Sequence, residues 1–463
     1  MVKKAALLLL LLLFFFTPPA AAGNEPGNEG PGATPSPRLE TAAKEPAKTN
    51  ELPLLTLDEA IRATLANHPL RQAARQKQEA AAAGLGAAKA EMLPKFSTSY
   101  SYYHLNDKPY GVFGPVTLPI GDDDINTWRI TATQPLFTGF ALVTRKQMAG
   151  LDLKGEKLAD EQLCLDLVKN TKLAYYRIFL ARRHLQVAEQ TVKNLSAHEH
   201  DAQALYQHGL VAYNDLLQAR VARAQALTLR ERAGRDCELA QAQLNLLMNR
   251  DLERKFRVHK LSIELDNETR DPHRLYVEAL EQRPELRQLK VDIAKAGLAV
   301  TLARSRYYPT LALVGSYEQT GHDFGGRENN YRNYDTAAIG LEADWTFFEW
   351  GKTRNQVKQQ GHLRQALAAK LEAVENRVRL EVKTALRDLK LAIVNARTAA
   401  TAVDQAQENY RITKLQYQQQ LATATTLLDA VTFLGRTRNN YYDSLFGCLQ
   451  ARAELERALG RRQ

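Results

Sequence analysis

The side chains that could carry chemistry in this 463-residue sequence do not form a catalytic pattern. His198 and His200 are two positions apart on a predicted helix, so their rings point to different sides, and His68 precedes a proline. The three cysteines each stand alone within a predicted helix, where burial as a small apolar side chain is expected: Cys164, Cys237 and Cys448. Motifs of serine hydrolases, zinc proteases and phosphate-binding loops are absent from the sequence. We therefore expect no enzyme, no cofactor and no bound metal.

Two acidic side chains stand out because they lie in a stretch that the sequence contains twice. At 206–219 the sequence reads YQHGLVAYNDLLQA, and at 417–430 it reads YQQQLATATTLLDA. Asp215 lies in the first copy and Asp429 in the second, where Thr426 takes the position that corresponds to Asp215. By position alone, Asp215 is an ordinary N-cap candidate and Asp429 lies on a solvated helix face.

Further landmarks show that the repeated stretch belongs to a larger internal duplication. Three pairs recur in the same order: NHPLRQ (67–72) with QRPELRQ (282–288), Pro94 with Pro309, and QPLFTG (134–139) with WTFFEWG (345–351). Chance similarity among helical segments would not keep several landmarks in one order, so the chain is expected to contain two copies of one unit. We place repeat 1 at 51–250, an inter-repeat linker at 251–271 and repeat 2 at 272–463.

The elements that position these residues are predicted to follow the same order in each repeat: a short helix, a second helix, a β-hairpin, a long helix and a return helix. The last three are expected at about 95–137, 139–206 and 214–248 in repeat 1, and at about 310–348, 351–418 and 425–459 in repeat 2. Thr56 with Glu59 has the pattern of a capping box, and Asp271 before Pro272 has that of an N-cap with a first-turn proline. At 1.5 Å per residue, each long helix would extend roughly 100 Å.

The repeated stretch would then form the tips of two helical hairpins. Residues 208–210 provide the turn in the first hairpin, and Asn214 or Asp215 is expected to cap the return helix. In the second hairpin Gln420 replaces the glycine of the turn. The cap of its return helix is expected to be one of three threonines: Thr423, Thr425 or Thr426.

The predicted strands alternate between apolar and polar residues. One face carries Trp128, Ile130, Ile339, Leu341 and Trp345, and the other carries Arg129, Glu342 and Asp344. Such strands of about ten residues fit a transmembrane β-barrel, with the first set facing lipid and the second facing the lumen, whereas a soluble sandwich would bury the apolar face. The connections at about 105–124 and 319–334 are expected to be long outward loops. Four strands cannot close a barrel and lipid does not tolerate open edges, so two, three or four chains must share one.

The beginning of the sequence indicates export. Residues 1–22 combine a basic start, an apolar core and small residues for cleavage, which is typical of a secretory signal peptide. Residues 23–50 are rich in Pro, Gly and Glu and are predicted to form a disordered leader. The net charge of +10 is spread along helices among Glu and Gln, so we expect solvated helix faces and no nucleic-acid partner.

These features together resemble the TolC-like outer-membrane efflux protein family. The resemblance rests on the signal peptide, the two-fold repeat, the NHP and QRPEL helix starts, QPLFTG and TFFEWGK after the strands, and the HGLVAYNDLLQA tip, and it covers about residues 52–460. It implies a mainly α-helical fold with a β-barrel part. In a homotrimer, four strands per chain would build a 12-stranded barrel in the bacterial outer membrane, and the duplicated helical hairpins would build a periplasmic α-barrel.

The resemblance also implies a function and site residues. The function would be that of a passive exit duct, which docks a periplasmic adaptor and an inner-membrane pump or ABC exporter for efflux or type I secretion. The tips that would meet the adaptor are Gly209, Leu210 and Val211, with Gln420 and Leu421 as their counterparts. Asp215 and Asp429 match acidic positions at the narrow end of the tunnel, and Thr426 stands where such pores carry an aspartate, which predicts a less acidic constriction. From the residues alone, a periplasmic coiled-coil tether without a pore remains the alternative.

Overall fold

The structure is a computed structural model that describes residues 53–259 and 271–461. The predicted signal peptide, the predicted leader and most of the predicted linker lie outside these residues. In the first part of the chain the elements are β1 (Leu54–Leu55), α2 (Leu57–Asn67), α3 (Pro69–Ala90), β2 (Lys95–His104), β3 (Tyr110–Phe113), β4 (Val116–Pro119), β5 (Asp124–Thr138), α4 (Ala141–Gln207), α5 (Tyr213–Leu247) and β6 (Arg257–Val258). In the second part they are α6 (Pro272–Gln282), α7 (Pro284–Arg304), a 3₁₀ turn at Ser305–Tyr307, β7 (Thr310–Gly321), β8 (Asp335–Asp344), α8 (Lys352–Gln418) and α9 (Ala424–Leu459).

The short helices begin at the signals that the sequence carries. The hydroxyl of Thr56 accepts a hydrogen bond from the backbone N–H of Glu59 at 3.3 Å, and the Glu59 carboxylate accepts one from the Thr56 backbone at 2.9 Å. This confirms the capping box at the start of α2. Asp271 accepts a hydrogen bond from the backbone of His273 at 3.1 Å and caps α6, as predicted. Pro69 and Pro284 occupy the first positions of α3 and α7.

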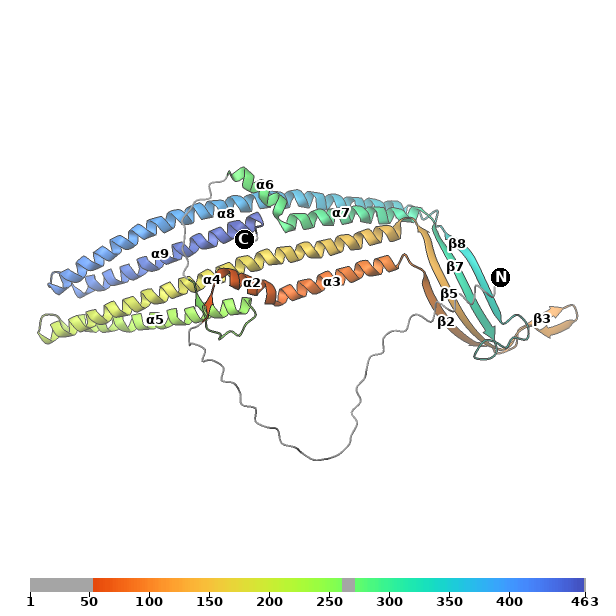
Figure 1. Cartoon of the computed structure of the whole chain (residues 1–463), viewed down its shortest axis with the longest axis horizontal. Coiled ribbons are helices and arrows are strands. Elements are labelled where there is room, and N and C mark those ends of the chain that lie inside the picture. Colours follow the sequence, from red (N-terminus) through yellow and green to blue (C-terminus); the bar gives the residue numbers. More distant parts are fainter. Residues whose placement is uncertain (1–52, 260–270, 462–463) are drawn as a thin grey trace, which may run out of the picture. The chain divides into compact units, whose positions relative to one another are not determined.

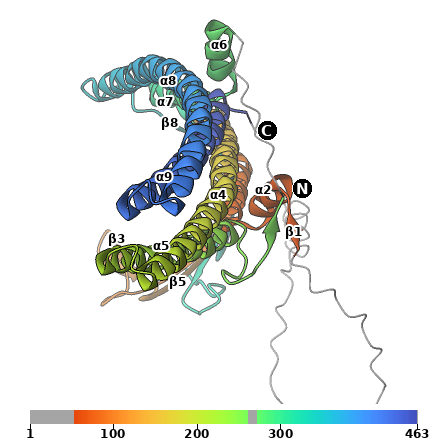
Figure 2. The same cartoon turned by 90° about the vertical axis from the view of Figure 1, so that its left-hand side faces the viewer.

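Two helices of 67 residues, α4 and α8, dominate the fold. Each extends roughly 100 Å at 1.5 Å per residue. Each turns back at its end into a shorter helix, α5 or α9, which packs antiparallel along it (Figure 1). Figure 2 shows α8, α9, α4 and α5 side by side in one curved layer, with α2 and α6 on its convex side. Among the described residues, no helix is both long enough and apolar enough to cross a membrane.

Apolar side chains hold this layer together in several clusters along its length. The largest joins α6 and α7 to α8 and α9, with Leu286, Val382 and Ile393 buried at its centre. A second joins α2 to α4 and α5 around Tyr175 and Leu244. Within these clusters the buried side chains recur every three or four residues, as from Val378 to Ile393 on α8, so each cluster buries one stripe of a helix.

The strands β2, β5, β7 and β8 form one antiparallel sheet in that order. β5 leads directly into α4, so this sheet and the hairpin tips lie at opposite ends of the long helices (Figure 1). Two features of the structure are not predicted by the sequence. One is a parallel pair of two-residue strands, β1 and β6, and the other is the hairpin of β3 and β4 within the connection expected to be a loop.

Candidate functional site

The two hairpin tips have the same backbone structure although their sequences differ. After α4, the N–H of Leu210 donates to the carbonyl of Leu205 at 2.9 Å, and Gly209 has φ +72°. After α8, the N–H of Leu421 donates to the carbonyl of Gln416 at 2.8 Å, and Gln420 has φ +61°. Both are helix ends of the Schellman type, in which a residue with a left-handed conformation closes the helix. The missing glycine therefore leaves the turn of the second tip unchanged and places a strained glutamine in it.

The tips expose apolar side chains to solvent. Leu210 is 54% exposed and Leu421 is 75% exposed, while Gly209 and Gln420 beside them are also exposed and Val211 is half-buried. All five adaptor-docking candidates thus lie at the ends of the two helical hairpins, and four of them are exposed.

The return helices begin differently from each other. The prediction that Asn214 or Asp215 caps α5 is wrong, because the chain re-enters the helix at Tyr213 and the N-cap is Ala212, which has no side chain that can accept a hydrogen bond. Asp215 instead lies in the first turn of α5, where its charge faces the positive end of the helix dipole. In α9 the cap is Thr423, whose hydroxyl accepts a hydrogen bond from the N–H of Thr426 at 3.2 Å.

The starts of α5 and α9 lie next to each other. The hydroxyl of Thr425 donates to the side-chain oxygen of Gln218 at 3.5 Å, which links the first turn of α9 to the second turn of α5. Asp215 is half-buried, whereas Thr426 and Asp429 are exposed. The structure therefore brings the three constriction candidates, Asp215, Thr426 and Asp429, to the beginnings of two adjacent helices, near the tips.

Beside Asp215 lies a buried polar pair that the sequence does not predict. The rings of His198 on α4 and Tyr417 on α8 lie 4.9 Å apart, and each residue is 3% exposed. Both ring nitrogens of His198 and the hydroxyl of Tyr417 are buried without a hydrogen-bond partner. Burial lowers the pKa of His198, although the charges of Asp201 and Asp215 oppose the shift, and burial and the same two charges raise the pKa of Tyr417. This pair lies at the seam between the two helical hairpins.

The strand register assigns the predicted lipid-facing and lumen-facing residues to opposite faces of the sheet. Cross-strand partners share a face, and Arg129 lies opposite Glu318, to which its Nε donates at 2.8 Å. Glu342 and Asp344 lie opposite Ala312 and Thr310, which share the face of Glu318. The other face carries Trp128, Ile130, Ile339 and Leu341, and Trp345 follows the end of β8 in the same alternation.

Among the residues that the structure describes, none covers the apolar face of this sheet. Ile339 is 78% exposed and Leu341 is 64% exposed. Both edge strands, β2 and β8, pair on one side only within the described part of the chain. A sheet with a large exposed apolar face and open edges is incomplete in water and in lipid alike.

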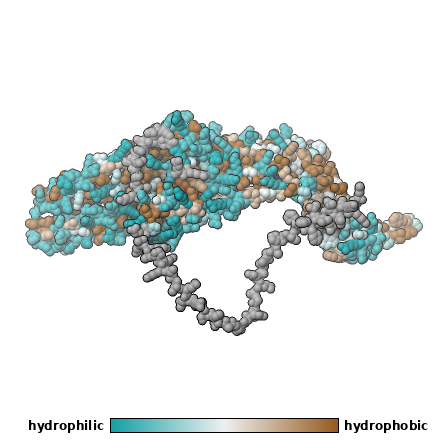
Figure 3. Space-filling model, viewed as in Figure 1, coloured by the Kyte–Doolittle hydropathy of each residue, from teal (hydrophilic) through white to brown (hydrophobic). Residues whose placement is uncertain are grey.

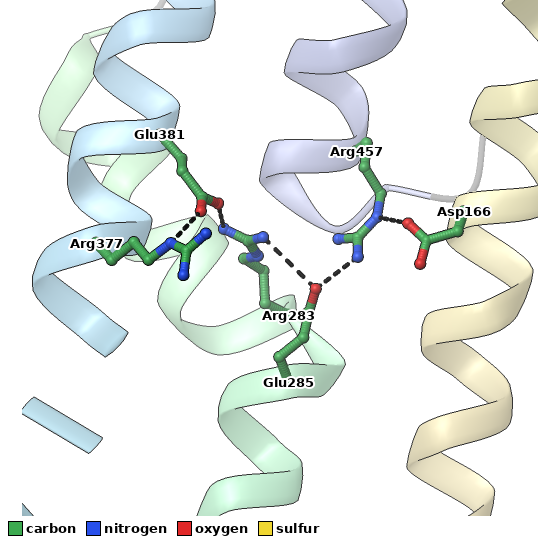
Figure 4. A network of polar contacts seen from close by, with 6 residues as sticks. All are labelled: Asp166, Arg283, Glu285, Arg377, Glu381 and Arg457. Carbon is green, nitrogen blue, oxygen red and sulfur yellow. Dashed lines mark hydrogen bonds and ion pairs between the residues drawn. The ribbon is translucent and has the colours of Figure 1, made fainter. Parts of the chain in front are cut away.

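An ionic network lies far from the tips, where α9 ends and α7 begins (Figure 4). It comprises Asp166, Arg283, Glu285, Arg377, Glu381 and Arg457. Arg457 donates to Asp166 at 2.6 Å and to Glu285 at 2.5 Å, and Arg283 donates to Glu381 at 2.6 Å. Burial raises the pKa of Glu285, but the hydrogen bond and charge of Arg457 together with the charge of Arg283 outweigh it, so the pKa lies below its ordinary value. The QRPEL landmark of the sequence supplies both Arg283 and Glu285, although the motif alone does not indicate the residues that they contact.

No metal or redox centre emerges from the residues that the structure describes. Among them, no group of three or more His, Cys, Asp and Glu side chains is arranged to hold a metal ion. The three cysteines are buried, and burial raises the pKa of the Cys237 and Cys448 thiols, which disfavours the reactive thiolate.

Comparison with known proteins identifies the family of this chain. Residues 60–250 and 275–461 match the family described as outer membrane efflux protein. The alkaline protease secretion protein AprF of Pseudomonas aeruginosa is 26% identical over 309 residues, which are 64% of this chain and 62% of AprF. The match thus spans less than two thirds of that relative's length.

Solved structures show the same fold. The outer membrane protein VceC of Vibrio cholerae has a TM-score of 0.74 at 17% identity, covering 88% of this chain and 96% of VceC. The CmeC outer membrane channel of Campylobacter jejuni has a TM-score of 0.72 at 17% identity, covering 87% of this chain and 85% of CmeC. The chain therefore belongs to the outer membrane efflux protein family and is a TolC-like protein of the bacterial outer membrane.

Proposed function

We propose that this protein is the outer-membrane exit duct of a tripartite efflux or type I secretion system, and that it works as a passive homotrimer. The observation that carries the proposal is the four-stranded sheet with two open edges and one exposed apolar face. In lipid, unpaired strand edges cost several kcal/mol per group, so β8 of one copy must pair with β2 of the next. Three copies with four strands each would make the 12-stranded barrel of this family.

Aromatic side chains at both ends of the apolar face support a membrane position for the sheet. At the end distant from the helices, the ring of Tyr100 lies 4.8 Å from that of Trp128 and 5.3 Å from that of Phe324. At the end next to the helices, four large aromatic side chains are exposed: Trp345, Phe347, Phe348 and Trp350. Such belts are typical of the two interfaces of a membrane β-barrel. A coiled-coil tether in the periplasm would have no use for this surface.

The helical hairpins supply the periplasmic part of the duct. Three copies of the curved helical layer would enclose a tunnel whose far end is formed by the tips. The exposed Leu210 and Leu421, with Gly209, Val211 and Gln420, would meet the periplasmic adaptor, which in turn holds the inner-membrane pump or ABC exporter. The adaptor would open the tunnel by binding the separated hairpins more tightly than the closed ones.

The acidic constriction follows from the same arrangement. Asp215 and Asp429 would contribute carboxylates at the starts of α5 and α9 in each of three copies, while Thr426 remains neutral and engaged with Thr423. The lumen of the barrel would carry Arg129, Glu342 and Asp344, of which Arg129 is neutralised by Glu318. The duct itself needs no cofactor, since transport energy would come from the pump.

The test combines mass and conductance measurements on the purified protein in detergent and in planar bilayers. We expect a trimer that forms small cation-selective channels, whose conductance increases in the variant with Asp215→Ala and Asp429→Ala. A folded trimer whose conductance ignores both changes would move the constriction elsewhere in the duct. A folded protein without any channel activity would overturn the proposal in favour of the tether.

A further inference from the structure

The β3–β4 hairpin is a small unit of its own between β2 and β5. Tyr110 pairs with Pro119 and Phe113 pairs with Val116, and the two strands form a sheet separate from the four-stranded one. An isolated two-stranded hairpin is at best marginally stable in water, and a further packing surface is usually needed. The hairpin is therefore expected to gain a covering surface in the assembled protein.

Both faces of this hairpin are apolar. Because cross-strand partners share a face, the register puts Tyr110, Val112, Thr117 and Pro119 on one face, and Gly111, Phe113, Val116 and Leu118 on the other. The large apolar side chains of the hairpin are between 49% and 67% exposed. A Cβ on Gly111 would lie 2.9 Å from the ring of Phe113, so this ring folds over the glycine and makes the second face compact. No charged residue occurs from 109 to 120.

Charged residues separate the hairpin from the apolar face of the large sheet. Lys108 Nζ lies 3.6 Å from Asp122 and 3.7 Å from Asp123, and His322 Nε2 lies 3.0 Å from Glu328 in the β7–β8 connection. Figure 3 shows the apolar hairpin at the right-hand end of the view with hydrophilic surface next to it. Lipid acyl chains could cover the hairpin only by removing water from these charges, which is costly. A protein surface is therefore the favoured cover.

We propose that the three β3–β4 hairpins of the trimer pack on one another and close the outer mouth of the barrel with an apolar plug. The inference rests on the proposed trimeric duct. In a ring of three, each hairpin has two neighbours, one for each face, and this is what a hairpin with two apolar faces requires. β2 is an edge strand, so the hairpin that follows it emerges at the boundary with the next copy. The lack of charge from 109 to 120 lets three copies meet without burying an ion.

Such a plug would act as a gate that differs from the acidic constriction at the tips. A narrow apolar passage loses its water, so ions do not cross it until its walls separate. Outward flow would then require two openings, one at each end of the duct.

Disulfide cross-linking tests the packing. Val112→Cys and Leu118→Cys introduce thiols on opposite faces of one hairpin, so they cannot bond within a chain. We expect the double variant to give covalent trimers on mild oxidation, while each single variant and the parent chain, whose cysteines are buried, stay unlinked. A folded trimer in which the double variant remains monomeric on denaturing gels would overturn the plug.

Channel conductance tests the gate without an engineered disulfide. Val112→Lys with Leu118→Lys should hydrate the plug and raise the open probability of the channel by roughly two-fold or more. Asn106→Lys, an exposed position in the charged region beside the hairpin, serves as the control and should leave it unchanged. An equal change in open probability in both variants would refute the plug and leave the proposed duct intact. Failure of the parent protein to form a trimer or a channel would instead refute the proposed function.

Discussion

Replacing Arg457 by alanine is expected to destabilise the junction of α9 and α7 by about 2–3 kcal/mol. Arg457 is 13% exposed at its side chain and serves two carboxylates, Asp166 and Glu285. Asp166 is 41% exposed and can be hydrated again at little cost. Glu285 is only 22% exposed, and one of its oxygens is already without a partner, so its burial without Arg457 accounts for most of the loss.

The matched control is Arg377→Ala in the same network. Arg377 is 78% exposed and donates to Glu381 one helical turn away at 3.1 Å. Exposed pairs of this kind contribute only about 0.3–0.5 kcal/mol. Chemical unfolding of the detergent-solubilised protein, followed by circular dichroism, should therefore show a loss of stability that is roughly four to ten times larger for Arg457→Ala than for Arg377→Ala. Equal losses for both variants would refute the argument that burial, and not the number of ion pairs, determines the contribution.

The pH dependence gives an independent check on Glu285. Its folded-state pKa lies below the ordinary value of 4.5, so the stabilisation is present above pH 4.5 and is lost as the pH falls through the folded pKa. Removing Arg457 takes away the hydrogen bond and the charge with which Arg457 lowers the pKa of Glu285, so the pKa of Glu285 rises in the variant and protonation at low pH relieves the variant of a buried charge. The difference in stability between parent and variant should shrink below about pH 4.5. A difference that stays constant down to pH 3 would exclude Glu285 as its source.

Three further predictions concern the tips and use thermal unfolding as the measurement. Gln420→Gly should stabilise the protein by roughly 1 kcal/mol because it removes a glutamine with a left-handed backbone conformation, and Gly209→Gln should destabilise it by a similar amount. Changes in stability of the same sign for the two variants would contradict this explanation. Thr423→Ala should cost about 1 kcal/mol, since the N–H of Thr426 loses its acceptor, and a neutral result would mean that water replaces the cap. The pKa of His198 lies below its ordinary value of 6.5, so the parent protein should lose stability as the pH falls through 6.5. The His198→Phe variant should lose less stability over the same pH range. Identical pH profiles for the two proteins would show that His198 does not titrate in this range.

Features that depend on neighbouring residues could be predicted from the sequence. The capping box at Thr56 and the N-cap at Asp271 involve residues no more than three positions apart, so their pattern is local. The two faces of the sheet were predictable for a similar reason, because side chains alternate along any strand and the assignment of Arg129 and Trp128 to opposite faces needs no knowledge of the fold. The predicted internal duplication provided a second instance of each pattern, and the family resemblance rests partly on it.

Features that depend on distant residues required the folded chain. Arg457 and Glu285 are 172 positions apart, and nothing in either local sequence indicates that they meet. His198 and Tyr417 come together only because α4 and α8 lie in one layer, and Gln420 adopts a left-handed conformation because the geometry of the helical hairpin imposes it against the preference of the residue. Local sequence thus determines the elements, the strand faces and the caps at Thr56 and Asp271 through short-range sterics and hydrogen bonds. Long-range packing decides which side chains are buried together and which residue tolerates strain.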